Sequence, residues 1–124
     1  MKRLETNQAP AAIGPYSQGI EAGNLVFISG QIPVDMATGE LCTGTIAEMT
    51  RCSLNNAAAI ADRAGTSLEN AVKTTVLLTD INDFAEVNKA YAEFFPGIAP
   101  ARSCFAVAAL PKNARIEIEV ICEK

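Results

Sequence analysis

Two segments near the end of the chain place charged side chains among apolar ones. Arg102 lies in the run Ala101 to Leu110, whose other residues are mostly small or apolar, and Glu117 lies in the alternating run Arg115 to Cys122. A partly buried guanidinium needs an anion, and its planar fork can bind a carboxylate through two parallel hydrogen bonds. A nearby glutamate can hold a water or an amine. The pair could therefore form a pocket for a small carboxylate.

A structural role explains the same two residues without a ligand. An ion pair between Arg102 and a glutamate could hold subunits together, and buried ion pairs are often structural. From composition and pattern alone, the ion pair is the simpler interpretation.

The other candidates for chemistry are weaker when each is taken alone. Glycines in such places are more often plain turns, and a lone tyrosine is usually a packed ring. A polar boundary residue and an unreactive thiol would explain the other two. A covalent mechanism is disfavoured for the cysteine because no base accompanies its thiol. These candidates are Tyr16 in a turn-rich segment, Ser29 and Gly30 at the end of a strand, Asn88 beside a helical stripe, and Cys104.

The composition removes several kinds of active site. The chain has no histidine, which excludes Ser-His-Asp and Cys-His nucleophiles, HExxH zinc sites and Cys/His zinc fingers. Its 4 cysteines include no CxxC pair, so we expect reduced thiols and no metal site. Cys42 and Cys52 belong to no recognisable motif.

Charge and hydropathy limit the partners and the location. With 14 acidic and 10 basic residues the net charge is -4, opposite to that of a nucleic-acid binder. No stretch approaches the roughly 20 apolar residues that span a bilayer, and residues 1–8 are too polar for a signal peptide. We therefore expect a cytoplasmic protein that binds neither nucleic acid nor membrane.

The hydrophobic pattern predicts one α+β domain over residues 1–124. A capping box at Thr45 opens a helix that Gly65 ends, and an apolar stripe from Phe84 marks a second helix that Pro96 must end. The last two strands are expected to form a hairpin through Pro111 to Asn113. The predicted strands are 4–6, 19–22, 25–29, 72–79, 101–110 and 115–122.

Alternation within the strands predicts which residues share a face. Bulky Phe105 is expected beneath the helices, which leaves Arg102 and Cys104 on the outer face together with Glu117. Runs such as Val26 to Ile28 are apolar on both faces, yet two helices cover only one. A second copy of the chain is the simplest cover, so we predict a homo-oligomer.

Seven motifs, taken together and in this order, resemble the RidA/YjgF family of reactive-intermediate deaminases over nearly the whole chain. They are Ile13-Gly-Pro-Tyr-Ser-Gln18, Ser29-Gly-Gln-Ile-Pro33, Val72-Lys-Thr-Thr-Val76, Asp83-Phe84 with Val87-Asn88 and Tyr91, Pro100-Ala-Arg-Ser-Cys104, Leu110-Pro111, and Ile116-Glu-Ile-Glu119.

The resemblance implies a chorismate-mutase-like fold, in which a six-stranded mixed sheet carries two helices on one face. It also implies a homotrimer with clefts between subunits, and hydrolysis of 2-imino acids such as 2-iminopropanoate and 2-iminobutanoate to 2-oxo acids and ammonia. No cofactor would be needed. By motif position, Arg102 would bind the substrate carboxylate and Glu117 would position water. The residues that would line the pocket are Tyr16, Ser29, Gly30, Asn88 and Cys104.

Two other functions remain open at this stage. The same arginine and glutamate would serve a non-catalytic trimer that binds small carboxylates or has a regulatory role. A chaperone-like or RNA-cleaving role resembles reports for some relatives, but the acidic charge and the missing histidine argue against RNA cleavage. Ala99 and Phe105 depart from the family pattern, which leaves the preferred substrate length open.

Overall fold

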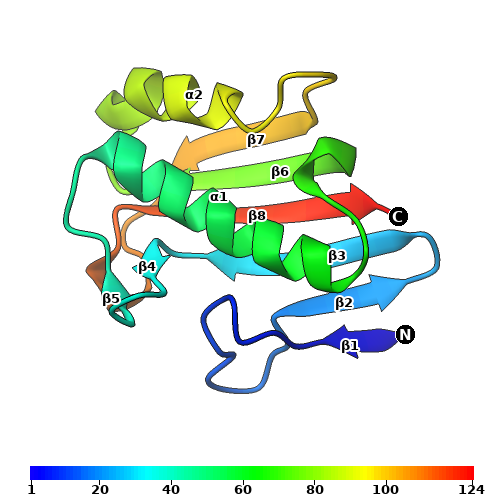
Figure 1. The fold of residues 1–124 in the computed structure, drawn as a ribbon. Helices are drawn as coiled ribbons and strands as arrows, with labels where there is room; N and C mark the ends of the chain where they lie inside the picture. Colours follow the sequence, from blue (N-terminus) through cyan, green and yellow to red (C-terminus); the bar gives the residue numbers. More distant parts are fainter.

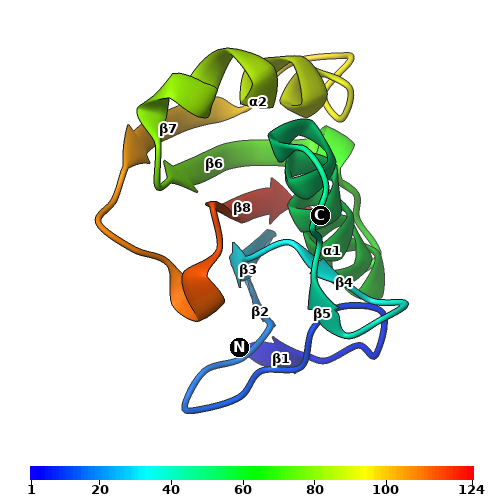
Figure 2. The same ribbon diagram turned by 90° about the vertical axis from the view of Figure 1, so that its left-hand side faces the viewer.

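The computed structural model describes residues 1–124 and contains a six-stranded sheet with two α-helices on one side (Figures 1 and 2). Only β6 and β7 pair in parallel, whereas the other neighbours are antiparallel. In spatial order the strands are β1 (Lys2–Leu4), β2 (Gly19–Ala22), β3 (Leu25–Gln31), β8 (Ile116–Glu123), β6 (Ala71–Leu78) and β7 (Ala101–Ala106). A small hairpin is formed by β4 (Val34–Asp35) and β5 (Glu40–Leu41), the α-helices are α1 (Ile46–Arg63) and α2 (Phe84–Ala92), and three short 3-10 helices complete the chain.

Local sequence signals explain where α1 begins and ends. The Thr45 hydroxyl accepts a hydrogen bond from the Glu48 backbone N–H at 3.1 Å, which caps the first turn. Gly65 adopts φ 80°, a left-handed conformation that ends helices and suits glycine. The predicted helix is therefore confirmed to within one residue at its end.

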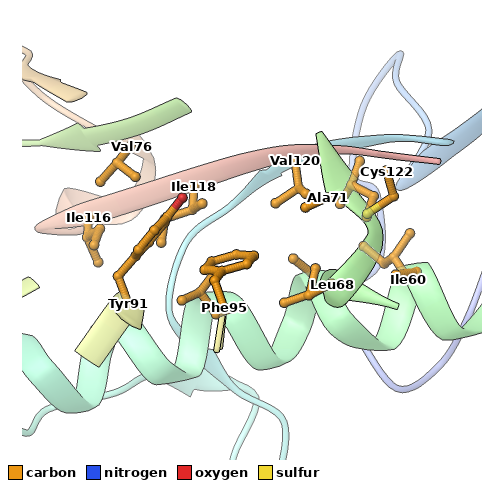
Figure 3. Packing of buried hydrophobic residues seen from close by; sticks show 14 of the residues in the cluster. Ile60, Leu68, Ala71, Val76, Tyr91, Phe95, Ile116, Ile118, Val120 and Cys122 are labelled. Carbon is orange, nitrogen blue, oxygen red and sulfur yellow. The ribbon is translucent and has the colours of Figure 1, made fainter. Parts of the chain in front are cut away.

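The hydrophobic core fills the space between the helices and the sheet. Ile116, Ile118 and Val120 alternate along β8 and point toward the helices, where Ile60 of α1 and Tyr91 of α2 contribute to the same cluster (Figure 3). The alternating residues of β8 are more exposed. This arrangement confirms the predicted α+β fold with both helices on one face.

One polar atom in this core has no partner. The Ser53 hydroxyl on α1 is buried and makes no hydrogen bond. Because an unpaired buried hydroxyl carries a desolvation cost and alanine favours helix, Ser53→Ala is expected to stabilise the fold by about 0.5–1.5 kcal/mol. Chemical denaturation should show a higher midpoint with an unchanged slope, and a lower midpoint would show that the hydroxyl has a partner.

The opposite side of the sheet, called here the open face, has no covering helix. Phe27 of β3 and Phe105 of β7 are 41% and 49% exposed there, and Leu77 of β6 lies beside Phe105 in the strand register. These side chains confirm that the sheet is apolar on both sides. None of the helices is long and apolar enough to cross a membrane.

The predicted hairpin between the last two strands is wrong. β7 lies at the edge of the sheet and pairs only with β6, while β8 inserts between β3 and β6. The strand also ends at Ala106 and not at Leu110, and Pro111–Asn113 form a turn of 3-10 helix. A parallel neighbour requires a crossover, which α2 supplies between β6 and β7. At the other edge, β1 covers Lys2–Leu4 and not the predicted 4–6.

Candidate active site

The predicted site residues form two clusters on opposite faces of the sheet. Arg102 lies on the face that carries the helices, whereas Glu117 lies on the open face. The strand register shows this directly. Arg102 pairs with buried Thr74 of β6, and Glu117 pairs with Leu77 of β6. Thr74 and Leu77 are three residues apart, so their side chains point to opposite faces of the sheet. Within one chain the two charged groups therefore do not meet.

This placement corrects the predicted faces of β7. Arg102 and Cys104 point toward α2, and Ser103 and Phe105 point to the open face. The prediction assumed that bulky Phe105 would be buried beneath the helices. In the structure, α2 offers Asn88 and two aromatic rings to a cation, so the arginine takes the inner side and the phenylalanine remains exposed.

The Arg102 cluster holds its guanidinium by contacts with α2. The Nη1 atom donates a hydrogen bond to the Asn88 side-chain oxygen at 2.8 Å. The Phe84 and Tyr91 rings lie 5.4 and 4.9 Å from the guanidinium carbon, distances at which an aromatic face attracts a cation. Arg102 is half-buried and forms no ion pair in the chain, so its other N–H donors are free for an anion.

Cys104 lies on the same inner side of β7 as Arg102. Burial raises the pKa of its thiol, and the opposing effect of Arg102 is smaller. A raised pKa means that little thiolate forms at neutral pH, which argues against covalent catalysis. The chain also contains no group of three or more Cys, Asp or Glu side chains that could hold a metal ion.

The Glu117 cluster forms where β3 is irregular. The register between β3 and β8 shifts between Ile28 and Gln31, and Gly30 lies within this bulge. The Glu117 carboxyl occupies the space beside Gly30: a Cβ atom built on that glycine would be 2.7 Å from the carboxyl carbon. The absence of a side chain at position 30 therefore makes room for the carboxyl group.

Two further predicted residues lie close to this cluster. The Ser29 hydroxyl donates to the Ser17 carbonyl oxygen at 2.6 Å, which ties β3 to the segment that carries Tyr16. Tyr16 is 55% exposed, and together with Gly30 it lines a cavity of about 570 Å³. The structure thus places Glu117 against Gly30, with Ser29 next to Gly30 in β3 and Tyr16 across the cavity that Gly30 also lines. Asn88, Arg102 and Cys104 lie together separately.

The environment of Glu117 favours its protonated form. Burial is the main cause and the neighbouring Glu119 carboxylate is the second, and both raise the pKa of Glu117. A carboxyl group with a raised pKa is a better proton acceptor than an ordinary glutamate once it is ionised. The group is therefore suited to take a proton from water or from a reaction intermediate.

The prediction did not include the two aromatic residues that support Arg102. Phe84 and Tyr91 were assigned to the apolar stripe of the second helix and to a motif of the family, and neither was assigned to the site. Their spacing around Asn88 on α2 places all three on one side of that helix, toward β7. To recognise their role from the sequence, one would have had to know that β6 and β7 pair in parallel, because this pairing places Arg102 beneath α2.

Comparisons with known proteins identify the family to which the chain belongs. A family model described as Endoribonuclease L-PSP matches residues 6–124. The Escherichia coli K12 2-iminobutanoate/2-iminopropanoate deaminase is 50% identical over 123 residues, 97% of this chain and 95% of its own. The RutC family protein y4sK of Sinorhizobium fredii is 52% identical over 118 residues, 95% of this chain and 94% of its own. A structure of E. coli TdcF with bound serine is 46% identical and aligns with TM-score 0.94, covering 100% of this chain and 99% of TdcF.

These matches cover the whole fold and both clusters. The chain belongs to the Endoribonuclease L-PSP family, which is also called the YjgF/RidA family.

Proposed function

We propose that the protein hydrolyses reactive 2-imino acids, such as 2-iminopropanoate and 2-iminobutanoate, to 2-oxo acids and ammonia. The observation that carries this proposal is the half-buried Arg102 guanidinium, which is held by Asn88 and has no carboxylate partner in its own chain. An orphan cation in this setting favours a carboxylate ligand over a structural ion pair. Relatives that are about half identical are named as deaminases of these imines.

A complete site would combine the two clusters from different chains. Arg102 lies on the edge strand β7, where another subunit can approach, and the Glu117 cluster lies on the uncovered face. We infer a homotrimer in which Arg102 of one subunit meets Glu117 of the next across a cleft. The number three comes from the resemblance to the family. The open apolar face supports the association itself.

The proposed mechanism needs only positioning and one proton carrier. Arg102 binds the carboxylate and places C2 of the imine in the cleft. Glu117 accepts a proton from water as the water oxygen attacks C2, and it passes this proton to the imine nitrogen to give a carbinolamine. Glu117 then takes the hydroxyl proton of the carbinolamine and delivers it to the nitrogen as the C–N bond breaks, so ammonia leaves and the C2–O bond becomes a carbonyl. No metal, cofactor or covalent enzyme intermediate takes part.

A competition assay tests the activity. A threonine dehydratase generates 2-iminobutanoate, and semicarbazide traps whatever has not been hydrolysed. The protein is expected to increase the release of 2-oxobutanoate and to reduce the trapped product in proportion to its concentration. Trapping that does not change at any protein concentration would exclude the deaminase.

A binding protein without turnover is the second candidate. The observation that favours it is that a relative, E. coli TdcF, has been described with bound serine, a molecule that carries a carboxylate. Calorimetric binding of 2-oxobutanoate by a protein that leaves imine trapping unchanged would support this function.

RNA cleavage by a protein free of contaminating nuclease would instead support the activity in the family's description.

The raised pKa of Glu117 predicts how the rate depends on pH. Because the ionised carboxylate accepts the proton, kcat/KM should fall as the pH drops through the pKa of Glu117, which burial raises above that of an ordinary glutamate. Glu119→Gln removes a like charge and lowers this pKa, so the acid limb should move to lower pH, although burial still keeps the pKa raised. The ¹³C shift of the Glu117 carboxyl should titrate in parallel.

The control for this shift is Glu123→Gln. Glu123 is an exposed acidic residue farther along β8, and its loss changes the net charge equally. An acid limb that moves by the same amount in both variants would show that total charge, and not Glu119 itself, sets the titration.

A further inference from the structure

The Tyr91 side chain contacts two neighbouring strands at once. Thr74 of β6 and Arg102 of β7 are register partners, so their side chains lie side by side beneath α2. The hydroxyl oxygens of Tyr91 and Thr74 are 2.7 Å apart and share a hydrogen bond. The Tyr91 ring also lies 4.9 Å from the Arg102 guanidinium carbon. One residue of α2 therefore connects a buried hydroxyl to the cation.

This contact is held firmly within the core. Thr74 is 0% exposed, and the Phe95 ring packs against Tyr91 with 4.6 Å between ring centres. Figure 3 shows the Tyr91 oxygen directed at the strands and Phe95 beside the ring. Burial raises the pKa of Tyr91, so the phenol keeps its proton at neutral pH. The ring cannot turn away without leaving buried hydroxyls unpaired, which is costly.

We propose that Tyr91 and Thr74 are positioning residues for the Arg102 fork. Their shared hydrogen bond fixes the ring on which the guanidinium rests, and this sets the direction of the N–H donors that would bind a carboxylate. An arginine that is ordered before binding loses less side-chain entropy when the ligand arrives. The inference rests on the proposed carboxylate-binding role of Arg102 and does not depend on hydrolysis.

Binding of 2-oxobutanoate, measured by calorimetry, tests the proposal. Tyr91→Phe keeps the ring and removes only the hydroxyl, and Thr74→Val removes its partner with little change in volume. Each should weaken binding by about 3- to 10-fold, the range expected when one long side chain must be ordered on binding. Thr74→Ser keeps a hydroxyl and should restore most of the affinity. In turnover, KM should rise more than kcat falls.

A second buried threonine provides the control. The Thr50 hydroxyl on α1 donates to the Ile46 carbonyl oxygen at 2.7 Å and is neither a hydrogen-bond partner nor an aromatic partner of Arg102. Thr50→Val should lower stability without changing affinity. The positioning role is overturned if Thr50→Val weakens binding as much as Thr74→Val, or if both Tyr91→Phe and Thr74→Val bind like the wild type.

The same measurements separate this inference from the proposed function. Wild-type affinity in Arg102→Ala would overturn the carboxylate site and the positioning role together. The expected pattern of affinities, found in a protein that does not hydrolyse imines, would support the positioning role and overturn only the deaminase.

Discussion

Arg102→Ala is expected to lower kcat/KM for 2-iminobutanoate by about 10²- to 10³-fold, because each charge-assisted hydrogen bond to the carboxylate contributes about 1.5–3 kcal/mol. The loss should appear largely in KM, since the carboxylate is bound in both the ground state and the transition state. Folding should change little, because Arg102 is half-buried and the variant breaks no ion pair. The competition assay gives the kinetics, and thermal unfolding with sedimentation checks fold and assembly.

Two further arginine variants show whether the loss in Arg102→Ala comes from the charge and the planar shape of this guanidinium. Arg102→Lys keeps the charge and loses the planar fork, so its kcat/KM should lie between those of wild type and Arg102→Ala. Arg63→Ala removes an exposed arginine at the end of α1 that donates only to the Glu5 carbonyl oxygen, and it should behave like wild type. Full activity in an intact Arg102→Ala assembly would contradict the proposed carboxylate site.

The elements that local sequence determines were predicted accurately. The capping residue Thr45 and the glycine at position 65 define α1, and the strict alternation of β8 identifies its buried side. The pairing of β7 was not predictable in the same way. Residues 107–110 continue the composition of the strand although the pairing stops at Ala106, and a short connection is compatible with a hairpin even where another strand intervenes.

The site residues were found in part from pattern and in part from resemblance. Alternation shows that Arg102 and Cys104 share a side of β7 but does not say which side that is. Side-chain size suggested Phe105 for the interior, and the structure reverses this choice because α2 supplies partners for a cation. The outcome leaves Phe105 exposed on the open face, where an apolar side chain is compatible with the proposed contact between subunits.

The second large effect is expected for Gly30→Ala, which should lower kcat by about 10- to 100-fold through displacement of the Glu117 carboxyl group. A Cβ at this position would lie 2.9 Å from a Glu117 oxygen and 3.0 Å from its Cγ atom, so the carboxyl must move. Its side chain is flexible and the glycine backbone has no positive φ, so folding should be nearly unaffected. Single-turnover rates measured at saturating imine report the loss.

A double-mutant comparison establishes whether this loss passes through Glu117. Glu117→Gln alone should lower kcat by about 10²- to 10⁴-fold, because it removes the proton acceptor. If Gly30→Ala acts only by moving that carboxyl, adding it to Glu117→Gln should cost little more, whereas independent effects would multiply. Gly97→Ala is the matched control, since a Cβ there meets nothing within 4 Å and its φ is not positive. Multiplicative losses in the double variant would mean that Gly30 contacts the substrate itself, and Glu117 would then not be the group that the glycine accommodates.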